Sequence, residues 1–283
     1  MSTYHTPVLV EEVITGLHIV SGKKYIDATY GGGGHTREII QRGGIVLGID
    51  ADEDAVKRVD THKDLVVVHG NFRNLASLAV QNGFDQVSGI LMDLGVSSFQ
   101  LDTPEKGFSY RFLESPLDMR LDQTQGQTAA EYINSAPEHE LYEIFTKYGE
   151  EERARTIIHA LIRTRQIKKI MTVGQLLESI DQAIGSYPDK YGVYSRIFQS
   201  LRIYINDEMN ALKEALAASK DLLVPGGRLA VISFHSLEDR IVKQYMRSEG
   251  WKHISKKPIV ADIDETKVNK RSRSAKLRIV EKL

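Results

Sequence analysis

Residues 24–35 read Lys24-Tyr-Ile-Asp-Ala-Thr-Tyr-Gly-Gly-Gly-Gly-His35, and residues 43–50 read Gly43-Gly-Ile-Val-Leu-Gly-Ile-Asp50, with a helical run between them. This pattern predicts a strand, a glycine-rich turn, a helix and a second strand that ends in an acid. The glycines allow positive φ and a close approach of a ligand to the backbone, in the first crevice of an α/β sheet. Asp50, at the tip of the second strand, is placed to accept hydrogen bonds from ribose hydroxyls. The stretch therefore predicts a nucleoside-binding half-site.

The glycine run departs from the motif of dinucleotide-binding folds, which requires the pattern G-x-G-x-x-G. The last position of that pattern falls on Thr36 when it starts at Gly31, and on Arg37 when it starts at Gly32, so the third glycine is missing. A site for S-adenosylmethionine has no pyrophosphate to hold and accepts a looser glycine turn. The mismatch therefore favours S-adenosylmethionine over a nicotinamide cofactor. A flexible linker is the other interpretation, and the strand-like and helix-like segments that flank the run argue against it.

The composition is that of an ordinary soluble globular protein, with 41% hydrophobic and 27% charged residues in a chain of 283 residues. This length allows one large domain, or one domain with an insertion. The formal net charge of -1 means that a nucleic-acid partner would have to bind through local basic patches. The chain has no cysteine, which excludes disulfides, cysteine-ligated zinc and thiol catalysis, and no metal site is predicted.

Neither a targeting segment nor a membrane segment is predicted. The first residues, from Met1 to Pro7, lack a basic region followed by an apolar run, so a signal peptide is not expected. No apolar run approaches the ~20 residues that a membrane-spanning helix needs. These features, together with the absence of cysteine, predict a cytoplasmic protein without a membrane partner.

Apolar segments that alternate with helical patterns predict a parallel sheet covered on both faces. Leu65–His69 reads as a buried third strand, and Ser88–Asp93 reads as a fourth strand that again ends in an acid. A turn at Pro225-Gly-Gly leads into a fifth strand, Arg228–Ser233, and two segments near the C-terminus read as a final antiparallel pair joined by a loop. The predicted fold class is α/β, with a Rossmann-like core and a mostly parallel sheet.

A helical segment interrupts this rhythm after the fourth strand. The chain from Leu94 onward first reads as a loop, and Thr128-Ala-Ala-Glu131 is then a capping box. The acids at 150–152 are predicted in the first turn of a longer helix, where they would match the helix dipole. The sequence therefore predicts a core of residues 1–102 and 205–283 and an all-helical insertion of residues 103–204.

Informative groups follow each of the first four predicted strands, and ligands of such sheets bind beyond the carboxyl ends of the strands. The groups are Gly33, Gly34 and His35 after the first strand, Asp50 after the second, Phe72 after the third and Asp93 after the fourth. Phe72 is positioned to stack on adenine. Each group alone has an ordinary structural explanation, as a helix cap, a solvated tip or a core residue. Their order at successive strand ends nevertheless predicts a nucleoside site.

Asp93 is the main catalytic candidate. Enzymes that methylate amines place an acidic or polar group at this strand end, where it holds the target amine. An exocyclic amine on a nucleobase is a poor nucleophile, because its lone pair is delocalised into the ring. An acceptor on its N–H would orient the nitrogen towards the methyl group and stabilise the positive charge as it develops. The alternative is that Asp93 only contacts the cofactor.

The segment Ser233-Phe-His-Ser-Leu-Glu-Asp-Arg240 closes the fifth strand, and His235 and Ser236 are predicted to face the same crevice. No G-x-S-x-G elbow surrounds either serine, so a serine hydrolase is not predicted. His235 is the second catalytic candidate, through contact with the substrate. The alternative is a helix cap, with Ser236 as the N-cap and Asp239 as its capping-box partner.

Basic side chains form two clusters that are candidates for RNA binding. The first lies along one predicted helix and comprises Arg155, His159, Arg163, Arg165, Lys168 and Lys169. The second lies in the C-terminal tail and comprises Lys267, Lys270, Arg271, Arg273, Lys276 and Arg278. Basic helix faces are usually only solvated, but two clusters that flank one crevice favour phosphate contacts. A base buried in a stack cannot reach such a crevice, so the substrate must be single-stranded or flipped.

Eight motifs of the chain together point to one family. They are Tyr25-Ile-Asp-Ala-Thr-Tyr-Gly-Gly-Gly-Gly-His-Thr36, Gly89-Ile-Leu-Met-Asp-Leu-Gly-Val-Ser-Ser-Phe-Gln-Leu-Asp102, Gly107-Phe-Ser109, Pro116-Leu-Asp-Met-Arg120, Tyr148-Gly-Glu150, Pro225-Gly-Gly-Arg228, Ile232-Ser-Phe-His-Ser-Leu-Glu-Asp-Arg240 and Arg273-Ser-Ala-Lys-Leu-Arg278. Nearly end to end, the chain resembles the bacterial small-subunit (16S) ribosomal RNA cytosine-N4 methyltransferases of the RsmH or MraW type.

The resemblance implies S-adenosylmethionine as methyl donor and N4-methylation of a cytosine in the decoding region of small-subunit ribosomal RNA, in an assembled or nearly assembled subunit. It places cofactor contacts on Gly33, Gly34, His35, Asp50, Phe72, Asp93 and Gln100, and it implies that the helical insertion helps to grip RNA. Two alternatives stay open, namely methylation of another nucleic acid and a non-catalytic RNA-binding assembly factor with a vestigial cofactor pocket. A homodimer is compatible with the sequence, which does not fix the oligomeric state.

Overall fold

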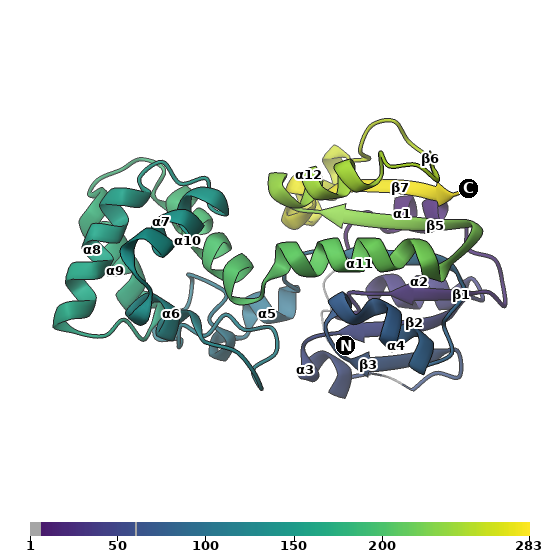
Figure 1. The fold of residues 1–283 in the computed structure, drawn as a ribbon, viewed down its shortest axis with the longest axis horizontal. Coiled ribbons are helices and arrows are strands. Elements are labelled where there is room, and N and C mark those ends of the chain that lie inside the picture. The colour runs from purple at the N-terminus through teal and green to yellow at the C-terminus, as the bar shows by residue number, and fades with distance from the viewer. Residues whose placement is uncertain (1–6, 60) are drawn as a thin grey trace. The chain divides into compact units, whose positions relative to one another are not determined.

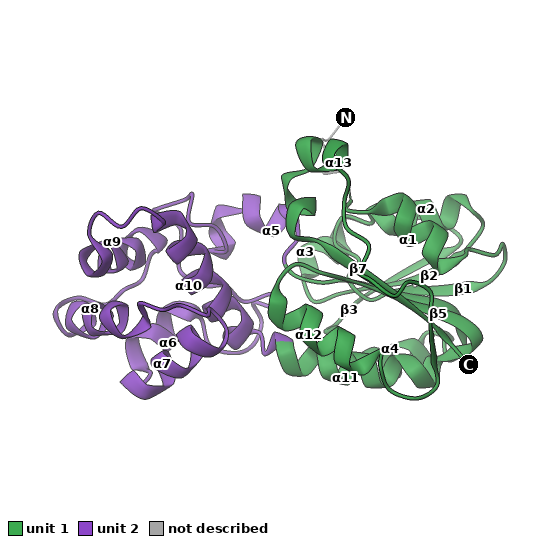
Figure 2. Ribbon diagram, turned by 90° about the horizontal axis from the view of Figure 1, so that it is seen from above, with its two compact units in different colours: residues 1–95, 209–283 green, residues 96–208 purple. Residues whose placement is uncertain are grey.

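The chain forms two compact units, which Figure 2 colours separately. The structure is a computed structural model that describes residues 7–59 and 61–283, so the segment from Met1 to Thr6, where no signal peptide is predicted, lies outside the described residues. Unit 1 comprises residues 1–95 and 209–283, and unit 2 comprises residues 96–208. Unit 2 begins before and ends after the predicted insertion of residues 103–204.

Unit 1 contains a seven-stranded sheet in the order β3-β2-β1-β4-β5-β7-β6 (Figure 1). The strands are β1 (Lys24–Asp27), β2 (Ile45–Asp50), β3 (Leu65–His69), β4 (Val87–Asp93), β5 (Leu223–Ser233), β6 (Trp251–His253) and β7 (Lys276–Lys282). Strands β1 to β5 are parallel to one another, and β7 is antiparallel to both β5 and β6. The strand order reverses between β1 and β4, which is the kind of switch point where ligands bind. The predicted α/β class with a mostly parallel sheet is confirmed.

Helices cover both faces of this sheet, as Figure 2 shows. They are α1 (Val10–Leu17), α2 (Gly34–Gln41), α3 (Glu53–Lys57), α4 (Leu75–Gln81), α11 (Glu208–Leu222), α12 (Ser236–Tyr245) and α13 (Ile263–Val268), with the 3₁₀ turns η1 (Phe72–Asn74) and η3 (Lys270–Ser274). One apolar core joins α1 and α2 to the sheet, and a second joins α4, α11 and α12 to it. Neighbours in β1 belong to opposite cores, Tyr25 to the first and Ile26 to the second, because successive strand side chains point to opposite faces.

Three sequence predictions for unit 1 were wrong in detail. Strand β3 is the edge strand and is not buried, since Val66 is 41% exposed. The Pro225-Gly-Gly segment is not a turn before β5 but lies within it, where the register with β4 shifts between Val87 and Gly89. The presumed loop before β7 contains α13, whose N-cap Asp262 accepts a hydrogen bond from the backbone N–H of Glu265.

Unit 2 is helical. Its elements are α5 (Ser98–Asp102), η2 (Pro104–Lys106), α6 (Ala129–Ser135), α7 (Glu138–Lys147), α8 (Ala154–Ile167), α9 (Val173–Ile184) and α10 (Lys190–Ile205). The predicted capping box at α6 is confirmed, because Thr128 and Glu131 each bond the backbone of the other. Buried residues of α6 to α10 form a core of the unit's own. None of the described helices is long and apolar enough to cross a membrane.

Two predictions for unit 2 were also wrong. Helix α5 lies in the segment that reads as a loop, and Ser97 and Gln100 form its capping box. The acids at 150–152 precede α8 rather than filling its first turn. Glu151 is buried there and accepts hydrogen bonds from the backbone N–H of Arg153, the N-cap of α8, and from Nε of Arg196.

Candidate functional site

The glycine turn between β1 and α2 is shaped by a tyrosine. Gly33 is the N-cap of α2 and has φ of 67°, a value that favours glycine. A Cβ atom at Gly33 would lie 2.6 Å from the hydroxyl oxygen of Tyr30, and a Cβ at Gly48 in β2 would lie 2.6 Å from Cδ2 of the same ring. Tyr30 is almost fully buried. Close packing of the turn on this ring therefore requires glycine at both positions.

Asp50 at the tip of β2 fastens the glycine turn to the sheet. Its Oδ2 accepts a hydrogen bond of 2.6 Å from the backbone N–H of Gly31, and its Oδ1 accepts one of 2.8 Å from that of Asp52. Burial raises the pKa of Asp50 to about 6, although these two amides lower it. Each carboxylate oxygen keeps further acceptor capacity, so the predicted ribose contact is compatible with this geometry and stays a prediction.

We expect the affinity for S-adenosylhomocysteine, the product form of the predicted donor, to be constant above pH about 6 and to fall below it by up to tenfold per pH unit. The reason is that only the ionised Asp50 carboxylate, which dominates above its pKa of about 6, accepts hydrogen bonds from hydroxyls with full strength. Titration calorimetry at a series of pH values measures the effect.

The Asp50→Asn variant is the control for this pH dependence, because Asn does not titrate. A variant that binds more weakly and independently of pH through this window assigns the effect to Asp50. An unchanged pH profile in the variant would transfer the effect to another carboxylate of the site. The effect on folding has the opposite sign. Because the folded pKa is raised, the native chain binds more protons, and the free energy of unfolding falls as pH rises from ~4 to about 6.

Asp93 ends β4 beside the switch point. Its backbone N–H donates a 2.7 Å hydrogen bond to Oγ1 of Thr29, which fixes the end of β4 against the turn after β1. Its side chain is 22% exposed, but Oδ1 is buried and has no hydrogen-bond partner among the described residues. Burial raises the pKa of Asp93, while His35 and Arg271 oppose that rise. A buried carboxylate oxygen without a partner is unfavourable by itself and favours a ligand that donates to it.

His35 lies between Asp93 and the backbone before α1. Its Nε2 is 2.9 Å from the carbonyl oxygen of Val8, and its Nδ1 is 3.8 Å from Oδ2 of Asp93. A carbonyl oxygen only accepts, so Nε2 carries a proton.

Asp27, at the end of β1, is a site residue that the sequence analysis did not select. It is buried, and its Oδ2 accepts a 2.7 Å hydrogen bond from Oγ1 of Thr36 in α2. Burial raises the pKa of Asp27, and His35 and Thr36 lower it. The only sequence signal for Asp27 was its position as an acid just before the glycine run. Its contact with Thr36 could not be predicted, because it depends on how the turn folds back onto β1.

The C-terminal tail contributes Arg271 to the same end of the sheet. Its guanidinium carbon lies 5.7 Å from the ring centroid of Phe234, which follows β5, and its charge acts on Asp93. A Cβ at Gly95 would meet the Phe234 ring at 3.7 Å. Arg271 is partly buried, whereas Lys270 and Arg273 beside it are exposed. Arg271, one of the tail residues predicted to bind RNA, is thus placed near Asp93.

His235 is the N-cap of α12, one residue earlier than the alternative with Ser236. The capping-box partner is Glu238 and not Asp239. Glu238 is buried, accepts a 2.8 Å hydrogen bond from the backbone N–H of Phe234, and has Oε1 at 3.0 Å from Nε2 of His235. This network fixes the turn after β5, so His235 has a structural role whether or not it also contacts the substrate.

Two further parts of the family motifs have structural roles in unit 1. Arg228 of β5 donates to Glu281 of β7 and to the carbonyl oxygen of Gly16, which ties α1 to these two strands. Asp239 of α12 accepts two hydrogen bonds from Arg278 of β7, at 2.7 and 3.1 Å. These contacts hold α1, β5, β7 and α12 together and so help to position the strand ends, although Arg228, Asp239 and Arg278 do not lie at the strand ends themselves.

Phe72 lies in η1, just after β3, and Gln100 lies in α5. Phe72 is half-buried against the core of unit 1, next to the strand whose partner β2 ends in Asp50. Gln100 belongs to unit 2, is buried, and accepts a hydrogen bond from the backbone N–H of Ser97 through Oε1. The predicted cofactor contacts of both residues stay predictions.

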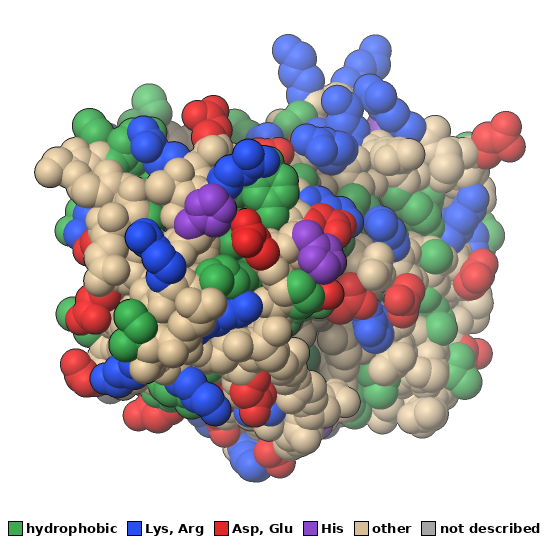
Figure 3. Space-filling model, turned by 60° about the vertical axis from the view of Figure 1, so that its left-hand side comes forward, with side chains coloured by type: hydrophobic (Ala, Val, Ile, Leu, Met, Phe, Trp, Pro, Cys, Tyr) green, Lys and Arg blue, Asp and Glu red, His purple; other side chains and the backbone are tan. Residues whose placement is uncertain are grey.

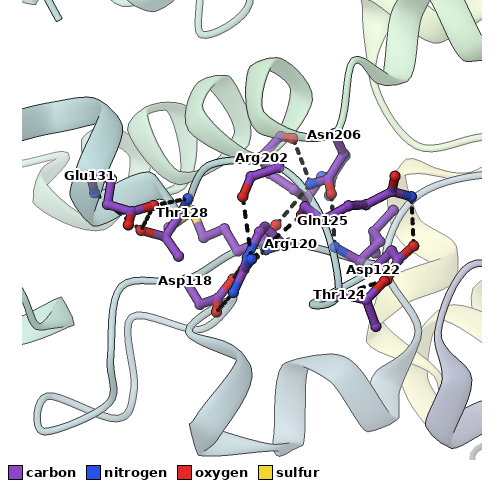
Figure 4. A network of polar contacts seen from close by, with 12 residues as sticks. Asp118, Arg120, Asp122, Thr124, Gln125, Thr128, Glu131, Arg202 and Asn206 are labelled. Atoms are coloured by element: carbon purple, nitrogen blue, oxygen red, sulfur yellow. Dashed lines mark hydrogen bonds and ion pairs between the residues drawn. The ribbon is translucent and has the colours of Figure 1, made fainter. Parts of the chain in front are cut away.

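The Pro116–Arg120 motif folds a loop of unit 2 (Figure 4). Arg120 donates to both carboxylate oxygens of Asp118, at 2.8 and 2.9 Å. Asn206, which follows α10, accepts from the backbone N–H of Leu121 and donates to the carbonyl oxygen of Met119. These contacts join the loop to the end of α10.

Most of the basic residues in and just after α8 lie on an exposed surface of unit 2, and their contact with RNA stays a prediction. Arg155 and Arg163 of α8 and the two lysines that follow it, Lys168 and Lys169, are exposed, while the opposite side of the helix is buried. Arg165 differs, because its Nη1 donates to the carbonyl oxygens of Ile133 and Ala136 at the end of α6. Arg165 therefore caps a helix, and the prediction that it extends the basic surface was wrong.

The strand ends of unit 1 fit an adenosyl ligand in three ways. Gly34 begins α2 without a side chain just after the end of β1, the Asp50 carboxylate retains acceptor capacity, and Oδ1 of Asp93 is a buried acceptor without a partner among the described residues. The residues that would hold the adenosyl ligand come from β1, β2, β4 and the turns that follow these strands.

Comparison with known proteins agrees with the motifs. The model of the MraW methylase family matches residues 2–283. Three similar proteins are each named Ribosomal RNA small subunit methyltransferase H. The one from Deinococcus deserti is 46% identical over 285 residues, covering 100% of this chain and 94% of the relative. That from Carboxydothermus hydrogenoformans is 43% identical over 314 residues, with 100% and 99% covered, and that from Bacteroides thetaiotaomicron is 43% identical over 299 residues, with 99% and 98% covered.

Proposed function

Because the chain belongs to the MraW methylase family, we propose that it transfers a methyl group from S-adenosylmethionine to the exocyclic N4 of a cytosine in small-subunit ribosomal RNA. The donor supplies an electrophilic methyl group on a sulfonium ion. Relatives that are 43–46% identical carry the name of a small-subunit ribosomal RNA methyltransferase, which supports the RNA class. The observation that carries the choice of an amine as acceptor is the buried, unpartnered Oδ1 of Asp93 at the end of β4.

Asp93 acts on the acceptor amine. Its carboxylate accepts a hydrogen bond from the N4 amino group, which orients the nitrogen lone pair and stabilises positive charge on that nitrogen as the new C–N bond forms. His35, with Nδ1 at 3.8 Å from Oδ2, and Arg271 favour the ionised form of Asp93. The nitrogen takes the methyl group as the bond between that group and the donor sulfur breaks, which leaves S-adenosylhomocysteine. The methylated nitrogen then releases its extra proton to water and becomes neutral.

The cofactor side of the site lies at β1 and β2. The glycine turn lets a ligand approach the backbone at the start of α2, Asp50 accepts from the ribose hydroxyls, and Phe72 stacks on the adenine. Asp50 performs two tasks, since it also holds the backbone amide of Gly31. The cofactor-binding residues and the fold of the turn are thus coupled.

The test is methyl transfer from labelled S-adenosylmethionine to unmodified small ribosomal subunits, free small-subunit ribosomal RNA, DNA and bulk protein, with the products digested to nucleosides and identified by mass. We expect N4-methylcytidine to form only when the acceptor is a ribosomal substrate. A different methylated nucleoside would contradict the assignment of the acceptor atom. Tight cofactor binding without transfer to any of these acceptors would favour the non-catalytic assembly factor.

Unit 2 is proposed to bind RNA through the exposed face of α8 and the two lysines, Lys168 and Lys169, that follow it. In the triple variant Arg163→Gln, Lys168→Gln and Lys169→Gln, RNA affinity should fall for all sequences alike, because phosphate contacts carry no sequence information. The slope of log affinity against log salt should become shallower by about 2, since each contact with single-stranded RNA contributes about 0.7. Filter binding over a salt series measures both quantities.

Arg165→Gln is the contrasting variant for this surface. It removes two hydrogen bonds to the end of α6 and should lower the melting temperature while leaving the salt slope unchanged. An unchanged slope in the triple variant would exclude α8 as a phosphate-binding surface.

A further inference from the structure

A small basic cavity of about 50 Å³ lies within unit 1, apart from the strand ends described above. It is lined by Lys243, Met246, Arg247, His253, Ser255, Lys256, Arg278 and Ile279. These residues come from α12 and the turn after it, from β6 and the loop that follows it, and from the middle of β7. Most of them are cationic or polar, and none is acidic.

The lining has an excess of positive charge. Arg278 is paired with Asp239 through two hydrogen bonds, and this pairing fixes its guanidinium. In contrast, within the described part of the chain no carboxylate lies within 4.0 Å of Arg247, His253 or Lys256. Lysine and arginine side chains gather at the top of Figure 3, at the height where the loop after β6 lies in Figure 1.

We propose that this cavity binds a backbone phosphate of the RNA substrate, next to the nucleotide that is methylated. The inference rests on the proposed function, which makes RNA the substrate. Arginine and lysine donors, a serine hydroxyl and one already neutralised guanidinium match a monoanionic phosphodiester. The cavity is too small and too polar for a nucleobase, so it contributes affinity and not base specificity.

The position of the cavity fits a neighbouring nucleotide. Lys243 is seven residues after Ser236, the first residue of α12, so it lies about 10 Å along the helix from the turn after β5. Arg278 pairs with Val231 of β5, two residues before Ser233 at the strand end. When the target base of an RNA strand enters the site at the strand ends, a phosphate of an adjacent nucleotide would lie about 10 Å away, which is where the cavity is.

The test compares the double variant Arg247→Gln and Lys256→Gln with the matched control Lys23→Gln and Lys63→Gln, which removes two exposed charges elsewhere in unit 1. We expect the cavity variant to raise KM for RNA about tenfold with kcat unchanged, and to make the salt slope of RNA binding shallower by about 1.4. Affinity for S-adenosylhomocysteine should be unchanged. RNA in which methylphosphonates replace phosphates near the target should bind both forms of the protein alike.

An RNA affinity and salt slope equal to those of the control variant would overturn the proposal. If the cavity variant loses competition by inorganic phosphate but binds RNA normally, the site takes a free anion and the proposal also fails. RNA binding is measured without turnover, so it tests the phosphate site independently of the proposed methyl transfer. A cavity effect on binding, without N4-methylcytidine as product, would contradict the proposed function and leave the phosphate site standing.

Discussion

Replacing Asp93 by Asn is expected to lower kcat for methyl transfer about 10²–10³-fold, the usual loss when one preorganised electrostatic group is removed from an active site. Asn has nearly the same shape and keeps the backbone N–H that bonds Thr29, so the end of β4 should stay folded. The neutral amide no longer stabilises positive charge on the acceptor nitrogen. The rate of the chemical step should therefore fall far more than binding.

Single-turnover methyl transfer and titration with S-adenosylhomocysteine separate these effects for Asp93→Asn. Asp85→Asn is the matched control, because Asp85 is an exposed acid of the same unit. Loss of cofactor affinity with a normal rate at saturation would assign Asp93 to the cofactor alone. Full turnover together with normal affinity would remove it from the site altogether.

Replacing Gly33 by Ala is expected to weaken the binding of S-adenosylhomocysteine at least about tenfold, equivalent to about 1.4 kcal/mol. Two effects add. A residue with a Cβ at φ of 67° is strained by about 1–2 kcal/mol. The new Cβ would also lie 2.6 Å from the Tyr30 hydroxyl, so the turn that presents its backbone at the start of α2 must shift.

Gly83→Ala is the control for backbone strain outside the glycine turn. Gly83 has φ of 77°, but a Cβ there meets nothing within 4 Å. Both variants should lose thermal stability through backbone strain, and only Gly33→Ala should also lose ligand affinity. Equal affinities of the two variants would show that neither strain at Gly33 nor crowding by Tyr30 affects the binding site.

Much of the fold could be predicted from local patterns. The strand, glycine turn and helix around Gly33 were predicted because apolar runs and glycines are themselves local signals, and the α6 capping box has a fixed spacing. The family that the motifs resemble is confirmed by the match of its model. In contrast, the exposure of β3 depends on its place at the edge of the sheet, which no local pattern specifies.

The site was predicted less completely, because its contacts join distant parts of the chain. The strand-end acids Asp50 and Asp93 were predicted from position alone. Their partners were not, since the amide of Gly31 reaches Asp50 only through the conformation of the turn, and Arg271 reaches Phe234 from the C-terminal tail. Gln100 was assigned to the cofactor by resemblance, while the capping box that it forms with Ser97 went unnoticed.

The ring of Tyr30 has a consequence for how this sequence can evolve. It crowds both Gly33 in the turn and Gly48 in β2, so a larger residue at either position collides with the same side chain. The three positions are therefore epistatic. Tyr30 must first become smaller before Gly48 can change, and Gly33 remains constrained by its backbone even then. Substitutions at these positions can therefore accumulate in only one order. A chimera that takes β2 from one relative and the turn from another should keep Tyr30 together with both glycines.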